Sequence, residues 1–360
     1  IAAFRKQLEV NPYDEWAHNL LGSVYWRQQK YERAAAAFRK QLEINPLDEY
    51  AYGSLGSMYC EWRKYDEAVP LLEKAVSLKP DNAPYHVSLG EAYLNLNQPD
   101  KALEAFDRAV EILPVPGIWN NVAYELSRHR AHLGRAQRYA ESAIAATAAS
   151  LRNVTLDRLR AEDLGQVSAI GSFWDTLGWI HFQNGDLEQA ERFIRAAWEL
   201  SQHGEVGHHL AQVYEKRGNK EEAIRTYAMA LAASRPPMET RQRLAALVGG
   251  DQRVDGLVEK ARSELAGVRT LKLGPLVKGS AEAEFFVLLA PGPKVEAVKF
   301  IRGSEKLRGF TGTLQATSLS ALFPDATPTK LVRRGVLSCT DSNVGCSFVL
   351  FTPDDVHSVN

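Results

Sequence analysis

The 360-residue sequence predicts an all-α solenoid of superhelical, antiparallel helix pairs, followed by a small α+β domain. Two observations predict this architecture. Between residues 15 and 115 the same spaced residues return every 34 positions, and a looser copy of the pattern continues to residue 237. After Val268, Ala-rich helical segments give way to alternating and β-branched runs, which are typical of strands.

Each copy of the 34-residue pattern describes two facing helices. In the first copy, Leu21, Gly22 and Tyr25 share one stripe of a first helix, because residues three and four apart lie on one face. Ala34 and Phe38 share a stripe of a second helix. The small residues lie where the helices cross, and a proline ends the second helix. The later copies and the closing prolines are Leu55, Gly56, Tyr59, Ala68, Leu72; Leu89, Gly90, Tyr93, Ala102, Phe106; and Pro46, Pro80, Pro114.

At these positions the chain resembles the tetratricopeptide repeat (TPR) family, whose pattern is W-x2-L-G-x2-Y, A-x3-F and a closing proline at this period. The first position departs from the family, since His18, Tyr52 and His86 occupy it. The fifth and sixth units, from Trp174 through Tyr227, resemble those of large extracytoplasmic bacterial TPR proteins. The resemblance therefore implies a bacterial repeat protein that binds other proteins.

The helical elements are expected in a simple order. Residues 1–14 match the second helix of a truncated repeat, with Phe4 and Pro12 in place, so what precedes Ile1 stays open. Units one to four follow at 15–150, then an insertion at 151–170 that we expect to be a short helix and a loop. Units five and six occupy 171–237, with Gly185 and Gly218 at turns that favour positive φ. Two capping helices, 239–247 and 254–265, lie within 238–268.

The last segment, 269–360, is predicted as the small α+β domain. Pro291-Gly292-Pro293 is expected to form a tight turn, and 305–319 one helix, although Gly309 and Gly312 weaken it. The order of elements resembles the C-terminal domain of TonB-type proteins. The expected strands are 270–276, 283–289, 295–301, 331–338 and 347–351.

Composition argues against several function classes. With a net charge of −1 the chain lacks the basic surface that nucleic acid requires, and no apolar run is long enough for a transmembrane segment. No nucleotide-binding, metalloprotease or Ser-His-Asp motif occurs, so we expect no catalytic residues, no metal site and no cofactor. His203, His208 and His209 are expected to be exposed at a helix start, with metal binding as the alternative.

Cys339 and Cys346 bracket a polar turn between two predicted strands. They could form a disulfide, remain two reduced thiols, or supply half of a metal site. A disulfide would suit an oxidising compartment, so a periplasmic or extracellular location is favoured over the cytoplasm. Cys60 lies alone in a repeat helix.

The family resemblance implies that first helices line a concave groove at positions 2, 5, 9, 12 and 13 of each unit. Trp16, Trp26, Tyr124 and Trp179 either face a ligand there or pack on the neighbouring repeat. Asn19 and Ser23 replace the Lys and Asn of the clamp that binds chaperone tails, which argues against that role. The predicted groove residues are Trp16, Asn19, Ser23, Trp26, Arg27; Tyr50, Ser57, Glu61; Glu91, Asn95; Asn120, Tyr124, Arg128; Asp175, Trp179, Phe182, Gln183; and His208, Gln212, Lys216.

The predicted function is a non-catalytic scaffold that binds a protein or peptide in this groove and supports complex assembly. Two alternatives remain open. The chain could be a self-associating structural subunit of an assembly or filament, or the regulatory part of a larger enzyme whose catalytic domain precedes residue 1.

Overall fold

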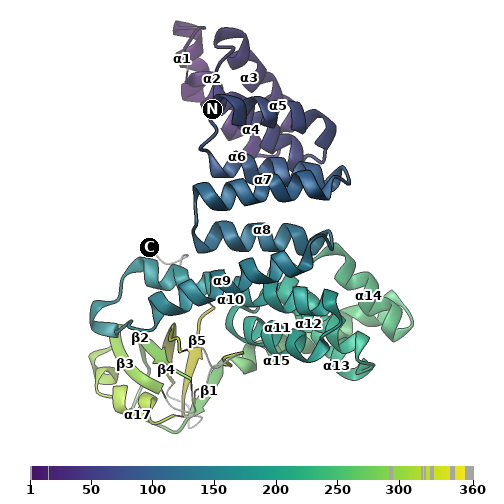
Figure 1. Ribbon diagram of the computed structural model, residues 1–360. Coiled ribbons are helices and arrows are strands. Elements are labelled where there is room, and N and C mark those ends of the chain that lie inside the picture. The colour runs from purple at the N-terminus through teal and green to yellow at the C-terminus, as the bar shows by residue number, and fades with distance from the viewer. Residues whose placement is uncertain are drawn as a thin grey trace. The chain divides into compact units, whose positions relative to one another are not determined.

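The computed structural model describes residues 2–14, 16–291, 295–317, 319, 322–324, 328–340 and 345–352. Its internal contacts divide the chain into two compact units, residues 1–136 and residues 137–360 (Figure 1). Among the described residues, no helix combines the length and the hydropathy needed to cross a membrane.

Unit 1 consists of helices that pair in sequence order. Its elements are α1 (Ala2–Val10), α2 (Ala17–Arg27), α3 (Tyr31–Ile44), α4 (Glu49–Glu61), α5 (Tyr65–Leu78), α6 (Ala83–Asn95), α7 (Pro99–Ile112) and α8 (Pro116–Arg128). The helices α2, α4 and α6 pack on α3, α5 and α7, and each of these first helices also contacts the next first helix, ending at α8. The predicted solenoid of helix pairs is confirmed. The next helix, α9 (Leu133–Leu151), contains the boundary between the units.

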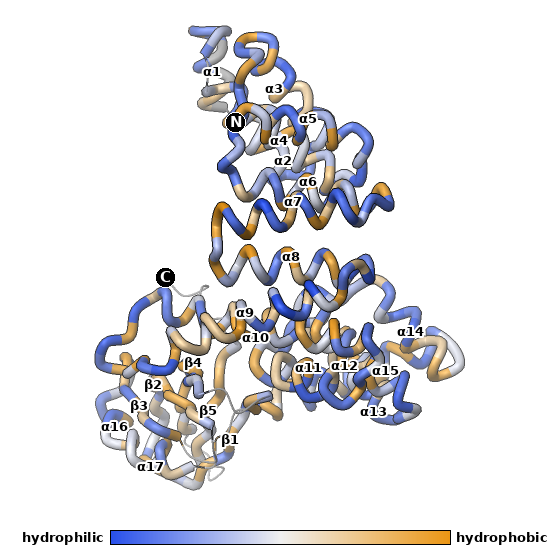
Figure 2. Tube along the Cα trace, in the orientation of Figure 1, coloured by the Kyte–Doolittle hydropathy of each residue, from blue (hydrophilic) through white to orange (hydrophobic). Residues whose placement is uncertain are grey.

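The repeated glycines let the two helices of each pair approach closely. A Cβ atom added at Gly22 would lie 2.8 Å from the ring of Phe38, and one added at Gly90 would lie 2.4 Å from the ring of Phe106. Phe38 and Phe106 are fully buried. The tubes of α6 and α7 alternate between hydrophobic and hydrophilic residues, as amphipathic helices do (Figure 2).

The turns inside the helix pairs use the left-handed backbone conformation. In the first three repeats Gln29, Arg63 and Asn97 have φ values of 56°, 58° and 57°, again 34 residues apart. In unit 2 the corresponding residues are Gly185 and Gly218, with φ of 84° and 78°, as predicted. Glycine adopts this conformation without the steric cost that a Cβ atom adds.

Unit 2 begins with helices that continue the repeats. They are α10 (Ala161–Asn184), α11 (Leu187–Ser201), α12 (Gly204–Lys216), α13 (Lys220–Ala232), α14 (Met238–Val248) and α15 (Val254–Val268), with the short helices η1 (Leu156–Arg158) and η2 (Asp251–Arg253). The predicted boundary between the insertion at 151–170 and the fifth unit, which was expected to begin at residue 171, is absent. Val167, Ile170 and Trp174 are all buried, so one apolar stripe runs through that point and α10 is a single helix.

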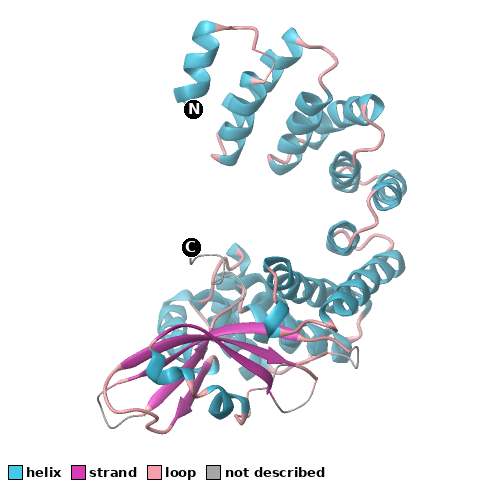
Figure 3. Cartoon of the chain, turned by 90° about the vertical axis from the view of Figure 1, so that its left-hand side faces the viewer, coloured by secondary structure: helices cyan, strands magenta, loops and turns pink. Residues whose placement is uncertain are grey.

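Unit 2 ends in an antiparallel sheet, drawn in magenta in Figure 3. In the described part of the chain this sheet has five strands in the order β1-β5-β4-β2-β3. The strands are β1 (Thr270–Leu273), β2 (Ala281–Leu289), β3 (Val295–Gly303), β4 (Leu331–Cys339) and β5 (Cys346–Leu350), which confirms the five predicted strands. The prediction of a single helix over 305–319 was wrong. Two short helices form, α16 (Glu305–Arg308) and α17 (Thr311–Gln315), separated at Gly309 and Phe310. Part of the predicted turn at Pro291-Gly292-Pro293 lies outside the described residues.

The sheet packs against the helices of its own unit. Lys299 on β3 donates to the carbonyl oxygen of Leu156 at 2.8 Å. The ring of Phe323 meets the fully buried Trp174 of α10 edge-on, with 6.5 Å between centroids. A pocket of about 190 Å³ between α11 and the sheet is lined mainly by leucines such as Leu200 and Leu350. The pocket is smaller than most ligand sites.

Candidate functional site

The exposed side chains of α2, α4, α6 and α8 in unit 1 form a surface that we call the first-helix face. Hydrogen bonds link neighbouring helices across it. Ser23 of α2 lies 3.1 Å from the Tyr50 hydroxyl of α4, and Ser57 of α4 lies 2.8 Å from the Ser88 hydroxyl of α6. In each pair one hydroxyl group donates to the other, so hydrogen bonds join α2, α4 and α6 across this face.

Large apolar side chains are exposed at the start of this face. Trp16 is 68% exposed, Leu20 44% and Tyr50 42%. Trp16 and Leu20 are four residues apart, so they lie on the same side of α2. An exposed apolar cluster of this kind marks surfaces that contact other molecules.

Trp26, at the other end of α2, is half-buried and held in place. Its indole Nε1 donates to Glu61 Oε2 at 2.6 Å, and the hydroxyl of Tyr31 donates to Glu61 Oε1 at 2.8 Å. Glu61 itself is exposed, as is Arg27 next to Trp26. The ring of Trp26 is therefore presented in a fixed orientation beside a carboxylate.

Asn19 does not reach the surface, although it was predicted to line the groove. It is 2% exposed, and its Nδ2 donates to Asp48 Oδ2 at 2.9 Å. Asp48 also accepts hydrogen bonds from the side chain of Gln41 and the backbone of Ala51. Asn19 thus joins the first repeat to the second from inside.

The negative charge of the Glu91 carboxylate is balanced by few hydrogen-bond donors or cations nearby. Among the described residues none donates a hydrogen bond to it, and the nearest cation is Arg128, with Nη2 4.0 Å from Oε1. Arg128 lies closer to Glu125, at 2.9 Å. Burial and the negative charge of Glu125 raise the pKa of Glu91 to about 7. Burial also raises the pKa of Glu125, against the charge of Arg128.

The remaining predicted residues of unit 1 are on the same two helices as this pair of carboxylates, α6 and α8. Asn95 donates from Nδ2 to the backbone oxygen of Glu91 at 2.9 Å. Asn120 and Tyr124 on α8 are half-buried, and the Oδ1 atom of Asn120 is buried without a hydrogen-bond partner among the described residues. Glu125 was missed in the sequence, although it follows Glu91 by one full period of 34 residues.

In unit 2 the side chains at the predicted groove positions contact one another. His209 Nδ1 lies 3.0 Å from both carboxylate oxygens of Asp175. The Trp179 ring stacks on His209 at 4.3 Å and on Phe182 at 4.7 Å. Lys216 lies over the ring of Phe182 at 4.8 Å. This stack packs one repeat on the next.

The prediction that the histidines are exposed was wrong for two of them. His208 is 4% exposed and His209 8%, because α12 packs against α11 and α13 as well as α10. His208 Nδ1 shares a proton with the hydroxyl of Thr240 at 2.9 Å. Gln212, one turn further along α12, is half-buried. The described residues contain no group of three His, Cys, Asp or Glu side chains that could hold a metal ion.

Burial moves the pKa values of the two histidines in opposite directions. Burial, with the charges of His209 and Arg243, lowers the pKa of His208 to about 4. Burial also opposes a charge on His209, but the attraction of Asp175 and its hydrogen bond outweigh it and raise the pKa. Asp175 therefore favours the protonated form of His209, whereas burial favours the neutral form of His208.

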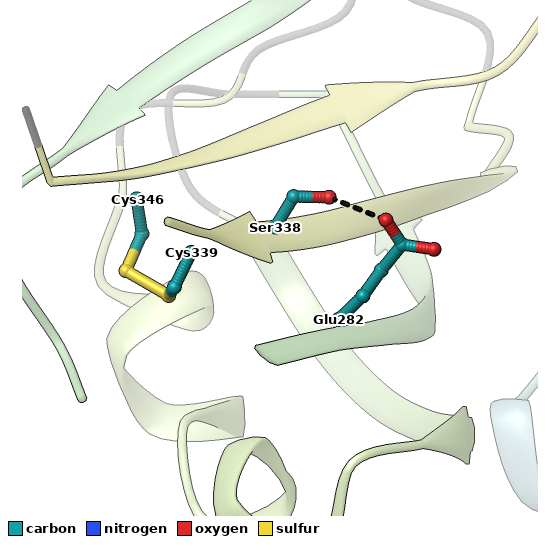
Figure 4. The surroundings of a disulfide bond; sticks show 4 residues. All are labelled: Glu282, Ser338, Cys339 and Cys346. Atoms are coloured by element: carbon teal, nitrogen blue, oxygen red, sulfur yellow. Dashed lines mark hydrogen bonds between the residues drawn. A yellow bond between two sulfur atoms is a disulfide. The ribbon is translucent and has the colours of Figure 1, made fainter. Parts of the chain in front are cut away.

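Cys339 and Cys346 are joined by a disulfide at the end of the β4 and β5 pair (Figure 4). Beside it, Ser338 donates a hydrogen bond to Glu282 of β2 at 3.0 Å. Most of the predicted turn between the two cysteines lies outside the described residues. Cys60 is a buried free thiol that donates to the backbone oxygen of Ser88 at 3.6 Å.

Models of the tetratricopeptide repeat match four stretches of the chain, residues 17–46, 63–120, 171–203 and 208–242. None of these matches extends into the sheet, so the resemblance to TonB-type domains remains a prediction. No curated protein matches the chain.

Two solved structures have a similar fold over more than two thirds of this chain. A tetratricopeptide repeat protein from Parabacteroides merdae is 17% identical, with a TM-score of 0.53, over 69% of this chain and 89% of that one. A chain of the APC/C hetero-tetramer Cut9-Hcn1 is 15% identical, with a TM-score of 0.50, over 72% of this chain and 45% of that one. At these identities the likeness is one of fold. The helix pairs, their glycine contacts and the matching models identify residues 17–46, 63–120, 171–203 and 208–242 of this chain as tetratricopeptide repeats.

Proposed function

We propose that the chain is a scaffold that binds a protein or peptide partner on the first-helix face of unit 1. The observation that carries this proposal is the exposure of Trp16, Leu20 and Tyr50 beside polar side chains that are held in place by hydrogen bonds. Rigid aromatic side chains supply most of the binding energy at protein interfaces, and neighbouring polar groups satisfy the backbone of an extended ligand.

The comparison between the units supports the choice of unit 1. In unit 2, Trp179 and Phe182 are stacked on each other and on His209, so their rings already have partners. In unit 1, Trp16 keeps 68% of its surface in contact with solvent. The tetratricopeptide repeats of the chain agree with a role in protein interaction. No catalytic role is proposed.

Site-specific photo-cross-linking tests the proposal. A photoreactive amino acid at position 50 is expected to capture a defined partner, whereas the same group at position 67 is not, because Glu67 is exposed on α5, a second helix. Trp16→Ala combined with Tyr50→Ala is expected to reduce capture by about tenfold or more, since exposed aromatic anchors contribute on the order of 2 kcal/mol each. Capture that is equal at both positions, or unchanged in the double variant, would contradict the proposal.

A further inference from the structure

We infer that the partner held on the first-helix face carries a basic side chain next to an apolar one, and that the basic group docks between Glu61 and Glu91. The inference rests on the proposed function and adds the chemical class of the ligand.

The charges on the helices of unit 1 favour a basic ligand. The first helices α4 and α6 contain three glutamates, Glu49, Glu61 and Glu91, and neither Lys nor Arg. The second helices α5 and α7 are also rich in carboxylates, but each contains cations as well, Lys74 on α5 and Lys101 and Arg108 on α7. A ligand that lies across α4 and α6 therefore meets negative charge, and complementary charge favours correct docking and rapid association.

The cations already present leave part of this charge uncompensated. Arg128 of α8 pairs with Glu125 at 2.9 Å and reaches Glu91 only at 4.0 Å. Glu61 accepts hydrogen bonds from two neutral donors, Trp26 and Tyr31, which orient its carboxylate without neutralising it. The carboxylates of Glu61 and Glu125 and the guanidinium of Arg128 thus surround Glu91. A further cation would balance the remaining negative charge.

The groups around Glu91 come from three helices. Glu61 and Cys60 are on α4, Tyr65 is on α5, and Glu125 and Arg128 are on α8. Arg128 is the one cation among them. A half-buried carboxylate in this setting destabilises the free protein, and such groups are typical of binding surfaces because the ligand supplies the missing interaction.

The apolar part of the ligand has its contact surface nearby. Trp26 donates its indole proton to Glu61, so the edge of an aromatic ring and a carboxylate lie side by side. Tyr50 continues the apolar surface on α4, with 42% of its surface exposed. A lysine or arginine also fits this arrangement in another way, since its aliphatic stem packs on rings while its charged end reaches a carboxylate.

Selection of peptides on the intact chain tests the inference. The probe is a displayed library of random decapeptides, which is selected on the immobilised full chain. Binding is compared with three variants: Glu61→Gln with Glu91→Gln, Glu67→Gln, and Trp16→Ala with Tyr50→Ala. We expect enrichment of peptides in which Lys or Arg is next to an aromatic or aliphatic residue. Glu61→Gln combined with Glu91→Gln is expected to weaken the best of these peptides by about tenfold, as the loss of complementary charges does. The matched control, Glu67→Gln on the exposed side of α5, should bind as the parent does.

The pH dependence provides a second readout that does not depend on the double variant. Affinity for the basic peptide is expected to rise between about pH 5.5 and pH 8, because Glu91, with a pKa of about 7, ionises in that range. Glu91→Gln should remove most of this rise. It is not expected to impair folding, since it takes away a buried charge.

The outcomes separate this inference from the proposed function. Enrichment of neutral or acidic peptides whose binding needs Trp16 and Tyr50 would overturn the basic ligand and leave the binding surface standing. Basic peptides that bind the double variant as well as the parent would also overturn it. Failure to enrich any peptide over the Trp16→Ala, Tyr50→Ala variant would overturn both.

Discussion

The two helical arrays share their packing and differ in what they leave exposed. In both, a glycine of the first helix touches a large side chain of the second: Gly56 faces Leu72 in unit 1, and Gly178 faces Ile194 in unit 2. At the surface positions, Trp16 is 68% exposed in unit 1, whereas Trp179 in unit 2 is stacked on His209. The repeat pattern therefore determines the scaffold, while residues between the pattern positions determine whether a surface remains free for a ligand.

The largest expected effect concerns the buried ion pair of unit 2. Asp175→Ala should lower the free energy of unfolding by about 3 kcal/mol, because it leaves His209 buried without its partner. Urea unfolding followed by tryptophan fluorescence measures the change. Asn19→Ala in unit 1 serves as the comparison and should cost less, because a neutral amide is removed there. An equal or larger loss for Asn19→Ala would contradict the contrast between the units.

The same pair predicts a pH dependence of stability. The pKa of His209 is raised in the folded state, so its contribution is fully present below the unfolded value of 6.5 and is lost as pH rises through the folded pKa. His208 acts in the opposite sense. Its folded pKa of about 4 means that stability falls as pH drops from 6.5 towards 4. Stability of unit 2 should therefore peak near pH 6.5, and His208→Gln should flatten the acid side alone.

The next effect tests the packing that the units share. Gly56→Ala places a Cβ atom 2.6 Å from Leu72, and Gly178→Ala places one 2.5 Å from Ile194. Each should cost about 1 to 3 kcal/mol through overpacking. Gly165→Ala on α10 is the control, since nothing lies within 4 Å of the added atom. If thermal unfolding shows a loss in one unit only, the two arrays do not share this contact.

A gain in stability is expected from the first-helix face. Glu91 has a folded pKa of about 7 against an ordinary value of 4.5, so it destabilises the fold progressively as pH rises through that interval. Glu91→Gln should raise the free energy of unfolding by about 1 to 2 kcal/mol at pH 8 and leave it unchanged near pH 4. Urea titrations at the two pH values measure this. Equal effects at both would show that the carboxylate is not the cause.

The smallest effect concerns the turns. Arg63→Gly should stabilise unit 1 by about 1 kcal/mol, because the residue has φ of 58° and glycine adopts that conformation without strain. The gain is reduced by the greater freedom of glycine in the unfolded chain. Gly218→Arg is the reciprocal change in unit 2 and should destabilise by a similar amount. Differential scanning calorimetry distinguishes the two signs.

Most of the fold could be predicted because it depends on periodic patterns. Leu, Gly, Tyr and Ala at fixed spacing located the helix pairs, and alternation of β-branched residues located the strands. Two glycines divide the segment after Ser304 into α16 and α17. The start of α10 did carry a local signal that was missed, since Glu162 and Asp163 lie in its first turn and Asp163 accepts a hydrogen bond from the backbone N–H of Arg160.

The candidate site was harder to predict, because a residue's position on a helix does not determine its partners. Asn19 and His208 occupy surface positions of the pattern but are buried by neighbours that are distant in sequence, Asp48 and Thr240. Glu125 illustrates the opposite case. The fourth unit was aligned one residue too early, so Tyr124 was assigned to the groove position that Glu125 occupies. The spacing of 34 residues between Glu91 and Glu125 indicated the correct alignment.

Trp174 is fully buried, and it meets Phe323, which belongs to the segment after the repeats. A shortened protein that ends before residue 269 would consequently expose the flank of α10 to water and be prone to aggregate. When the repeats are transferred into another protein, the C-terminal domain should therefore remain attached, because it shields the apolar side of α10 from water.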